Sequence, residues 1–368
     1  MDRLKLFFFL ALLVSAGSAK AYPDLIRHNY VNCTACHVAP TGGFALNGYG
    51  RMMSKELLSR WGGEREAEPL HGLLPEGSIP ESLIVGGNVR ILQVHRESPD
   101  RRTGRGFPMQ AAIELGATYG RFTGVFSIGE LQQRPRGWRP ISTRFYGMWT
   151  ARDELTFRAG RFVPFFGVMT PYHTLPTRQG LGLGPGGERD TFETVWSGES
   201  WNLASSVSVT PRGPVADDER ETLATAQVNR NFLGSYRVGL SYLHGDSNIS
   251  ARDALGVHGL LGFNEKWAYV TEFTFQNSRR KAGGEATGLF HFSQLLYEVT
   301  KGVNLYFLEE YQKADLTDSA TLVDAFGPGV RFFPRPHFEL DFVFTKRREA
   351  EVADRYDDYA WLMLHYYF

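Results

Sequence analysis

The chain lacks several features that mark common classes of protein. Its 368 residues include only two cysteines, Cys33 and Cys36, so the second cysteine pair of a typical structural zinc site is missing. Forty basic residues balance forty acidic ones, and this zero net charge points to neither nucleic acid nor an anionic surface as a partner. No apolar run reaches the ~18–20 residues that a membrane-spanning helix needs. Nucleic-acid binding and a helical membrane protein are therefore both disfavoured.

The first 21 residues have the three parts of a secretory signal peptide. Arg3 and Lys5 supply positive charge, residues 6–14 are apolar, and residues 15–21 contain small side chains that suit cleavage. The apolar part is too short to span a bilayer. We therefore expect a signal peptide over residues 1–21 and a mature chain that begins at Tyr22.

Both cysteines belong to the sequence Cys33-Thr34-Ala35-Cys36-His37, hereafter the CxxCH box. Two thiols at this spacing can form thioethers to the vinyl groups of a haem, and His37 can be an axial ligand of the iron. A redox dithiol would be expected beside a βαβ pattern, which the sequence lacks, and a structural disulfide would not need His37. The box therefore predicts one covalently bound haem c, which suits an exported protein.

Aromatic residues and glycine are abundant, and from residue 83 onward the sequence has a period of two. Aromatic side chains make up 14% of the chain, and 40 residues are glycine. Segments 109–119, 267–276 and 338–345 place apolar side chains at every second position with polar ones between them. Alternation over about 10 residues, repeated many times, is typical of outer-membrane barrels.

The connections between these segments alternate in length. Short turns are predicted at residues 119–121, 151–154, 198–200, 231–235, 263–266, 300–302 and 333–336. Long polar loops are predicted at residues 97–107, 132–139, 163–189, 210–221, 245–253, 277–286, 313–319 and 346–357. These connections delimit about 16 strands and place both chain ends on the short-turn, periplasmic side.

Two further segments bear on the barrel. Residues 360–368 alternate to a terminal Phe368, which resembles the assembly signal of bacterial outer-membrane barrels; an ordinary soluble β-protein that ends in phenylalanine is the alternative. The longest loop, 163–189, is rich in glycine and proline. It either folds inward to narrow the lumen or lies on the outer surface. Polar interiors are normal for such barrels, so we assign no relay role to lumen-facing histidines such as His291 and His365.

Residues 22–80 differ in composition from the barrel. We predict a short helix over 54–61, with Ser54 as its N-cap, and a linker rich in glycine, proline and charge up to residue 80. The predicted fold class is all-β: a transmembrane antiparallel β-barrel of about 16 strands over residues 81–368, preceded by a small haem-binding cytochrome c segment over residues 22–80.

The flanks of the box extend the motif. Arg27 precedes it, and Leu46-Asn47-Gly48-Tyr49-Gly50-Arg51 follows it. With the barrel behind it, this layout resembles the outer-membrane monohaem cytochrome–porin fusions, which include bacterial ferrous-iron oxidases. The resemblance rests on motifs in the haem segment and on layout elsewhere. It implies that Cys33 and Cys36 hold the haem and that His37 is the proximal iron ligand.

The remaining haem contacts stay open. Met52 and Met53 lie far enough along the chain to fold back as the distal ligand, although core packing is the alternative for methionine. His28 is a further candidate, and His71 is a more distant one. Arg27 and Arg51 could pair with the haem propionates or be solvated charges.

The resemblance implies electron transfer at the bacterial outer membrane. One haem, in the periplasm or in the barrel lumen, would exchange electrons between an extracellular redox partner and a periplasmic c-type cytochrome. With ferrous iron as donor the protein would be an oxidoreductase, and otherwise a conduit. The alternatives are a solute-transporting porin with a haem-containing gate or docking segment, and a periplasmic cytochrome anchored by the barrel. Outer-membrane lipid is an expected partner, and a homotrimer is an open possibility.

Overall fold

The computed structural model describes residues 23–43, 45–74, 77–131, 144–170, 175–184, 186–212 and 215–368. The predicted signal peptide, Tyr22 and the predicted loop at 132–139 lie outside the described residues. Within the described residues, no helix is long and apolar enough to cross a membrane.

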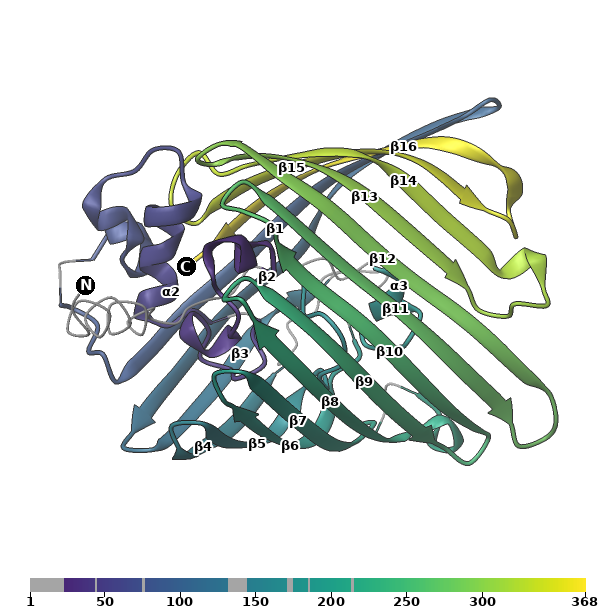
Figure 1. Ribbon diagram of the computed structural model, residues 1–368, viewed down its shortest axis with the longest axis horizontal. Coiled ribbons are helices and arrows are strands. Elements are labelled where there is room, and N and C mark those ends of the chain that lie inside the picture. Colours follow the sequence, from purple (N-terminus) through teal and green to yellow (C-terminus); the bar gives the residue numbers. More distant parts are fainter. Residues whose placement is uncertain are drawn as a thin grey trace, which may run out of the picture.

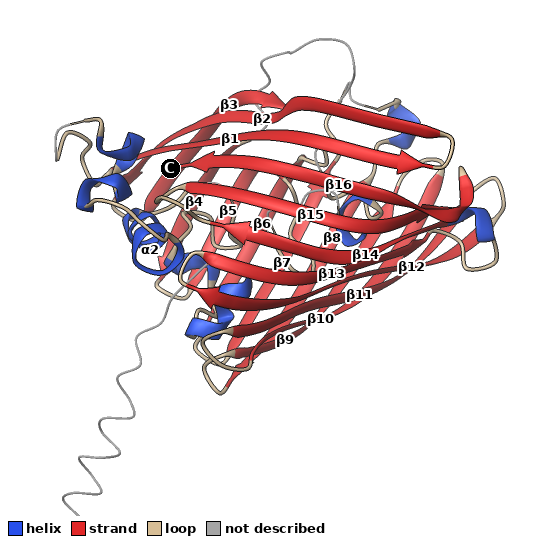
Figure 2. Ribbon diagram, turned by 90° about the horizontal axis from the view of Figure 1, so that it is seen from above, coloured by secondary structure: helices blue, strands red, loops and turns tan. Residues whose placement is uncertain are grey.

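Sixteen antiparallel strands form a closed barrel, in which each strand pairs with the next along the chain and the first pairs with the last (Figures 1 and 2). The predicted number of strands is therefore confirmed. The strands are β1 (Leu83–Ser98), β2 (Arg101–Tyr119), β3 (Phe122–Leu131), β4 (Phe145–Arg152), β5 (Leu155–Phe162), β6 (Arg189–Ser197), β7 (Trp201–Val209), β8 (Thr222–Phe232), β9 (Tyr236–Asp246), β10 (Ser250–Gly262), β11 (Trp267–Arg280), β12 (Glu285–Thr300), β13 (Val303–Lys313), β14 (Leu322–Phe332), β15 (Phe338–Glu349) and β16 (Ala353–Tyr367).

The two faces of the barrel differ in polarity as the alternation predicts. Phe273 and Phe275 of β11 are exposed on the outside, whereas Glu272 and Thr274 between them are buried on the inside. The last strand repeats this arrangement, with Leu362 on the outer face. A closed barrel satisfies every backbone hydrogen bond between strands and leaves no open edge, which a bilayer requires.

All seven predicted short turns are present, but four predicted long loops are wrong. The predicted loops at 97–107, 245–253, 277–286 and 346–357 are mostly strand, because β1, β9, β11 and β15 each continue to within a few residues of the next strand. Charged side chains at these ends form ion pairs across the strands, such as Arg96 with Asp357 at 3.0 Å. Backbone hydrogen bonds between strands do not require apolar side chains. The strands can therefore extend beyond the part of the barrel whose outer face is apolar.

In the described part of residues 23–80 the regular elements are short helical turns and an isolated β-bridge between His37 and Leu46. The helical elements are the 3₁₀ turns η1 (Pro23–His28), η2 (Cys33–Ala35), η4 (Glu64–Ala67) and η5 (Pro69–Gly72), the α-helix α2 (Gly48–Met53) and the π-helical turn η3 (Ser54–Leu58). The predicted helix over 54–61 is confirmed only over residues 54–58, which form η3. Ser54 as its N-cap is wrong, because the helical stretch begins at Gly48 and Asn47 caps it. The Ser54 hydroxyl instead lies 3.2 Å from the hydroxyl of Tyr367 in the last strand.

This segment lies at the short-turn end of the barrel (Figures 1 and 2). Its first part packs against the inner wall, whereas Trp61 and His71 contact Phe332 and Phe338 at the rim. Ile26 is fully buried in a cluster that includes wall residues Leu260 and Phe292. The backbone N–H of Arg60 donates to the carbonyl of Phe333 in a short turn, at 2.7 Å. Burial of apolar side chains and backbone pairing therefore hold the segment in the mouth of the barrel.

The long loop after β5 folds into the lumen, so the inward alternative for residues 163–189 is confirmed. It carries the helix α3 (Pro176–Gln179), which Figure 1 shows inside the barrel. The backbone N–H of Val168 donates to the carboxylate of Glu272 in β11 at 2.9 Å, and Leu181 is fully buried against Leu223 and Leu243. Polar groups of the wall thus satisfy backbone groups that the loop buries.

Candidate functional site

The CxxCH box forms one tight turn. The backbone N–H groups of Cys36 and His37 both donate to the carbonyl of Cys33, at 3.2 and 3.0 Å. His37 then pairs with Leu46 in a short antiparallel bridge. The turn places both cysteines and His37 close together, on a backbone that its own hydrogen bonds fix.

The Asn-Gly-Tyr-Gly-Arg element after the box holds this turn in place. The side-chain amide of Asn47 donates to the carbonyl of Ala35 at 3.0 Å, and its oxygen accepts from the N–H of Gly50 at 2.8 Å. Its backbone N–H donates to the carbonyl of Cys36 at 2.8 Å. Arg51 donates to the carbonyl of Leu46 at 3.0 Å. In this structure the element therefore stabilises the box, and asparagine both caps α2 and links α2 to the box.

Gly42 lies against the box on another side and has a left-handed backbone, with φ of 84°. A β-carbon at this position would lie 3.3 Å from the β-carbon of Cys33 and 3.7 Å from the ring of His37. Glycine adopts this conformation without strain and leaves the space beside the thiol and the imidazole free of a side chain.

A large cavity lies beside the box. It comprises about 1600 Å³ of space, part of it open to solvent, between the box, the barrel wall and the inward loop, and Cys36 and His37 both line it. A second cavity of about 750 Å³ borders Cys33, and Thr41 and Met169 line both cavities. We refer to them as the His37 cavity and the Cys33 cavity.

The environment of Cys33 differs from that of a reactive redox thiol. Burial raises the pKa of the Cys33 thiol, and the positive charge of Arg237 opposes this only in part. Reactive cysteines have a lowered pKa, because the thiolate is the nucleophile. The direction of the shift therefore argues against a redox dithiol at this position.

The methionine candidates for a distal ligand separate in the structure. Met53 lines the His37 cavity, and the hydroxyl of Tyr30 lies 3.5 Å from its sulfur. Met52 is not among the residues that line this cavity, and its side chain is 42% exposed. Met169, which the sequence did not suggest, reaches the same cavity from the inward loop.

The histidine candidates lie elsewhere. His28 is 3.8 Å from the carboxylate of Glu298 in the wall, and it does not line the His37 cavity. His71 packs edge-on against Phe338 and lies 3.4 Å from Glu66, also away from the cavity. The structure therefore brings neither histidine beside the box on the cavity side.

The two arginines proposed as propionate contacts make other contacts in the structure. Arg27 is buried and pairs with Glu298 at 2.6 Å, and it does not line the His37 cavity. Arg51 is held at Leu46, and burial lowers its pKa. Four other buried arginines line the cavity: Arg90, Arg144, Arg158 and Arg178.

Two of these arginines show how neighbouring side chains hold a guanidinium group at the cavity. Arg158 of β5 pairs with Glu193 at 2.8 Å, donates to the Thr41 hydroxyl at 2.9 Å and stacks on the ring of Phe162. Arg144 pairs with Glu114. The closed barrel brings these residues to one cavity.

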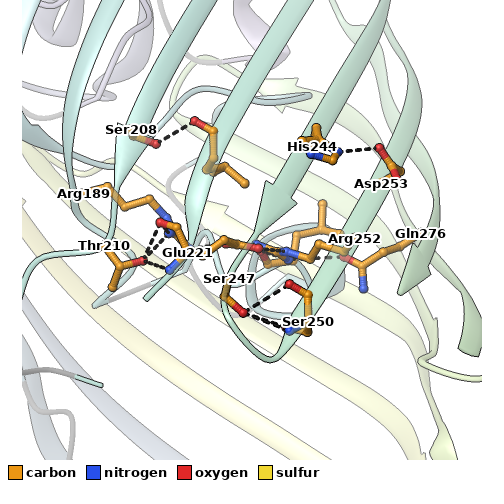
Figure 3. A network of polar contacts seen from close by, with 12 residues as sticks. Arg189, Ser208, Thr210, Glu221, His244, Ser247, Ser250, Arg252, Asp253 and Gln276 are labelled. Atoms are coloured by element: carbon orange, nitrogen blue, oxygen red, sulfur yellow. Dashed lines mark hydrogen bonds and ion pairs between the residues drawn. The ribbon is translucent and has the colours of Figure 1, made fainter. Parts of the chain in front are cut away.

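A polar network centred on Glu221 connects the barrel wall to the inward loop (Figure 3). The carboxylate of Glu221 binds Arg189 at 2.8 Å and Arg252 at 2.6 Å. Arg252 also donates to the carbonyl of Leu181 in the loop at 2.7 Å. One carboxylate thus holds two guanidinium groups in the geometry that the loop needs.

No family model matches the chain, and no curated protein matches it. Solved structures with a similar fold are the trimer form of OmpT of Vibrio cholerae (TM-score 0.61, 11% identity), an anion-selective porin from Comamonas acidovorans (0.60, 12%) and Salmonella typhi OmpF in complex with daunomycin (0.59, 9%). Each covers 78% of this chain, which in turn covers 99%, 99% and 97% of those chains. At these identities the likeness shows the fold alone, which is a porin-like barrel.

Proposed function

We propose that this protein is an outer-membrane electron-transfer protein with one haem c attached to the CxxCH box inside a porin-like barrel. The observation that carries the proposal is that Cys36 and His37 line a cavity between the box, the wall and the inward loop. A box on the surface of the segment would have no such relationship to the barrel.

The residues present fit a haem. Cys33 and Cys36 would hold it on one turn, and His37 would be its proximal ligand. Tyr146, Phe162 and other apolar side chains line part of the cavity. When bound, the haem supplies one-electron redox chemistry, and the protein supplies its ligands and surroundings.

Four arginines line the cavity together with Glu114 and Glu188. Arg144 and Arg158 are buried there, each beside one glutamate, and guanidinium groups bind carboxylates in a fixed planar geometry. They are better candidates for propionate contacts than Arg27, whose guanidinium pairs with Glu298 away from the cavity.

The position of the segment suggests a route for electrons. It lies at the short-turn end, which we assign to the periplasm, and a periplasmic c-type cytochrome would dock there. The inward loop lies between the cavity and the outer end, where an extracellular donor or acceptor would approach; ferrous iron is the first donor to test. By analogy with the trimeric neighbour, we expect a homotrimer.

A solute-transporting porin with a haem-containing gate is the second candidate. The fold likeness to porins, one of them anion-selective, favours it for the barrel. The N-terminal segment and the inward loop both pack inside the lumen, which favours a blocked pore instead.

Purified protein in liposomes separates the two functions. The electron-transfer proposal predicts covalent haem staining that Cys33→Ser abolishes, and oxidation of that haem by an impermeant acceptor added outside. It also predicts conductance far below that of a general porin. Wild-type protein without covalent haem would overturn the proposal, and open-pore conductance with an unreactive haem would favour the transport function.

A further inference from the structure

One buried histidine of the barrel wall faces the same cavity as His37. His365 lies in the last strand, is only 3% exposed and lines the His37 cavity. Its Nδ1 is 2.7 Å from a carboxylate oxygen of Glu339, so Nδ1 donates the proton and Nε2 has the lone pair. Among the described residues, Nε2 is buried without a hydrogen-bond partner.

A buried nitrogen acceptor without a partner is costly, so such a group calls for an explanation. The carboxylate of Glu339 is itself held 3.3 Å from Arg331, which also lies 3.6 Å from Asp341. All three of these side chains are at most 2% exposed. The ring of His365 is therefore fixed in one tautomer and one orientation by a chain of buried charges.

This arrangement is the one that metal-binding histidines use. A histidine that binds a metal through one nitrogen nearly always donates its other N–H to a carboxylate or a carbonyl, which orients the ring and raises its basicity. We propose that Nε2 of His365 is the distal ligand of the haem iron, opposite His37. The inference rests on the proposed function, because it needs the haem.

The competing ligands at the cavity are less well prepared. The sulfur of Met53 lies 3.5 Å from the Tyr30 hydroxyl, and that of Met169 lies 3.2 Å from the guanidinium of Arg178. His258 is also buried, but it borders the Cys33 cavity, and its Nε2 lies 2.7 Å from the Asn229 side chain.

The proposal has a consequence for assembly. His37 belongs to the N-terminal segment and His365 to the strand that closes the barrel against β1. The iron would thus join the two parts of the protein, and full ligation would require a closed barrel. Two histidine ligands would also give a lower reduction potential than histidine with methionine.

Near-infrared magnetic circular dichroism and electron paramagnetic resonance on the full-length ferric protein test the proposal without any substitution. We expect a low-spin haem with the signature of two histidine ligands. A histidine–methionine signature, or a high-spin haem, would overturn the proposal while leaving covalent haem and the proposed function intact.

Variants identify the residue. His365→Ala should convert the haem to high spin, and added imidazole should restore low spin; His365→Met should keep low spin and raise the potential. Met53→Leu, Met169→Leu and His258→Gln are the matched controls and should leave the spectra unchanged. Haem staining reports whether the haem is attached in each variant. The change in electrophoretic mobility on heating reports whether the barrel has folded. An unchanged spectrum in folded His365→Ala would contradict the assignment. A change from low spin to high spin in one of the control variants would also contradict it.

Discussion

Gly50 and Cys36 touch through their backbones. A β-carbon on residue 50 would lie 2.3 Å from the carbonyl oxygen of Cys36 and 2.9 Å from its β-carbon. Helix α2 therefore packs on the CxxCH box at a distance that only glycine allows, and the same carbonyl accepts a hydrogen bond from Asn47. This contact explains why glycine stands at position 50 of the element that follows the box.

Gly50→Ala should separate α2 from the box. The overlap is with backbone atoms, which cannot rotate away, so we expect a cost of about 1–3 kcal/mol locally and a clear loss of covalent haem per folded barrel. Gly48→Ala is the control on the same helix, because its β-carbon would lie 3.8 Å from the nearest atom, in Arg51. Haem staining, normalised to the amount of folded barrel, measures the yield. Equal yields in the two variants would show that the contact is unimportant for haem attachment.

Asn47 offers two substitutions that separate its two roles. Asn47→Asp keeps the oxygen that accepts from Gly50, but it loses the donor to Ala35; Asn47→Ala loses both. We expect Asn47→Ala to cost about 1–2 kcal/mol of local stability. The amide of Gly50 should exchange its hydrogen faster in Asn47→Ala only. The amides of residues 33–37 should exchange faster in both variants. Unchanged exchange over the box in both would contradict this role.

The Glu221 network predicts the stability of the inward loop. Glu221→Gln should weaken its hold on Arg189 and Arg252, and so loosen the attachment of Leu181. Because these groups are largely buried, we expect about 1–3 kcal/mol and faster hydrogen exchange over residues 163–184. Asp246→Asn removes an exposed partner of Lys281 and serves as the control, since exposed pairs contribute little. Equal exchange in the two variants would count against the network.

His337 predicts a pH dependence for the docking of the N-terminal segment. It lies buried between β14 and β15, and its backbone N–H donates to the Ser54 hydroxyl at 2.7 Å. Burial lowers the pKa of His337 to about 4, and the neighbouring charges of His71 and Arg51 act in the same direction, against one hydrogen bond with the backbone of Arg51.

The sign follows from proton binding. Between about pH 6.5 and 4 the released state binds a proton that the docked state does not, so stability is full above pH 6.5 and falls as the pH drops. The loss reaches about 3 kcal/mol at most. Limited proteolysis of residues 54–72 from pH 7 to 4 measures it, and His337→Gln should show a flatter profile. Identical profiles would mean that other groups control docking.

Much of the barrel could be predicted because its signals are local. The period of two and the turn residues need only neighbours in sequence, and they gave the strand count and all seven short turns. The outer ends of the strands could not be predicted, because their ion pairs, such as Arg96 with Asp357, join residues far apart in the sequence. The helix start was missed for a smaller reason: both Asn47 and Ser54 are good N-caps, and packing decided between them.

The candidate site divides in the same way. By itself the sequence determined the spacing of Cys33, Cys36 and His37, the alternating strands and the predicted place of the box before the barrel, because these depend on covalent order and local periodicity. Only the tertiary structure decided which side chains meet the box. Arg158 and His365 reach one cavity with His37 because the barrel closes around the segment, and closure depends on pairing between β1 and β16 at opposite ends of the strand order.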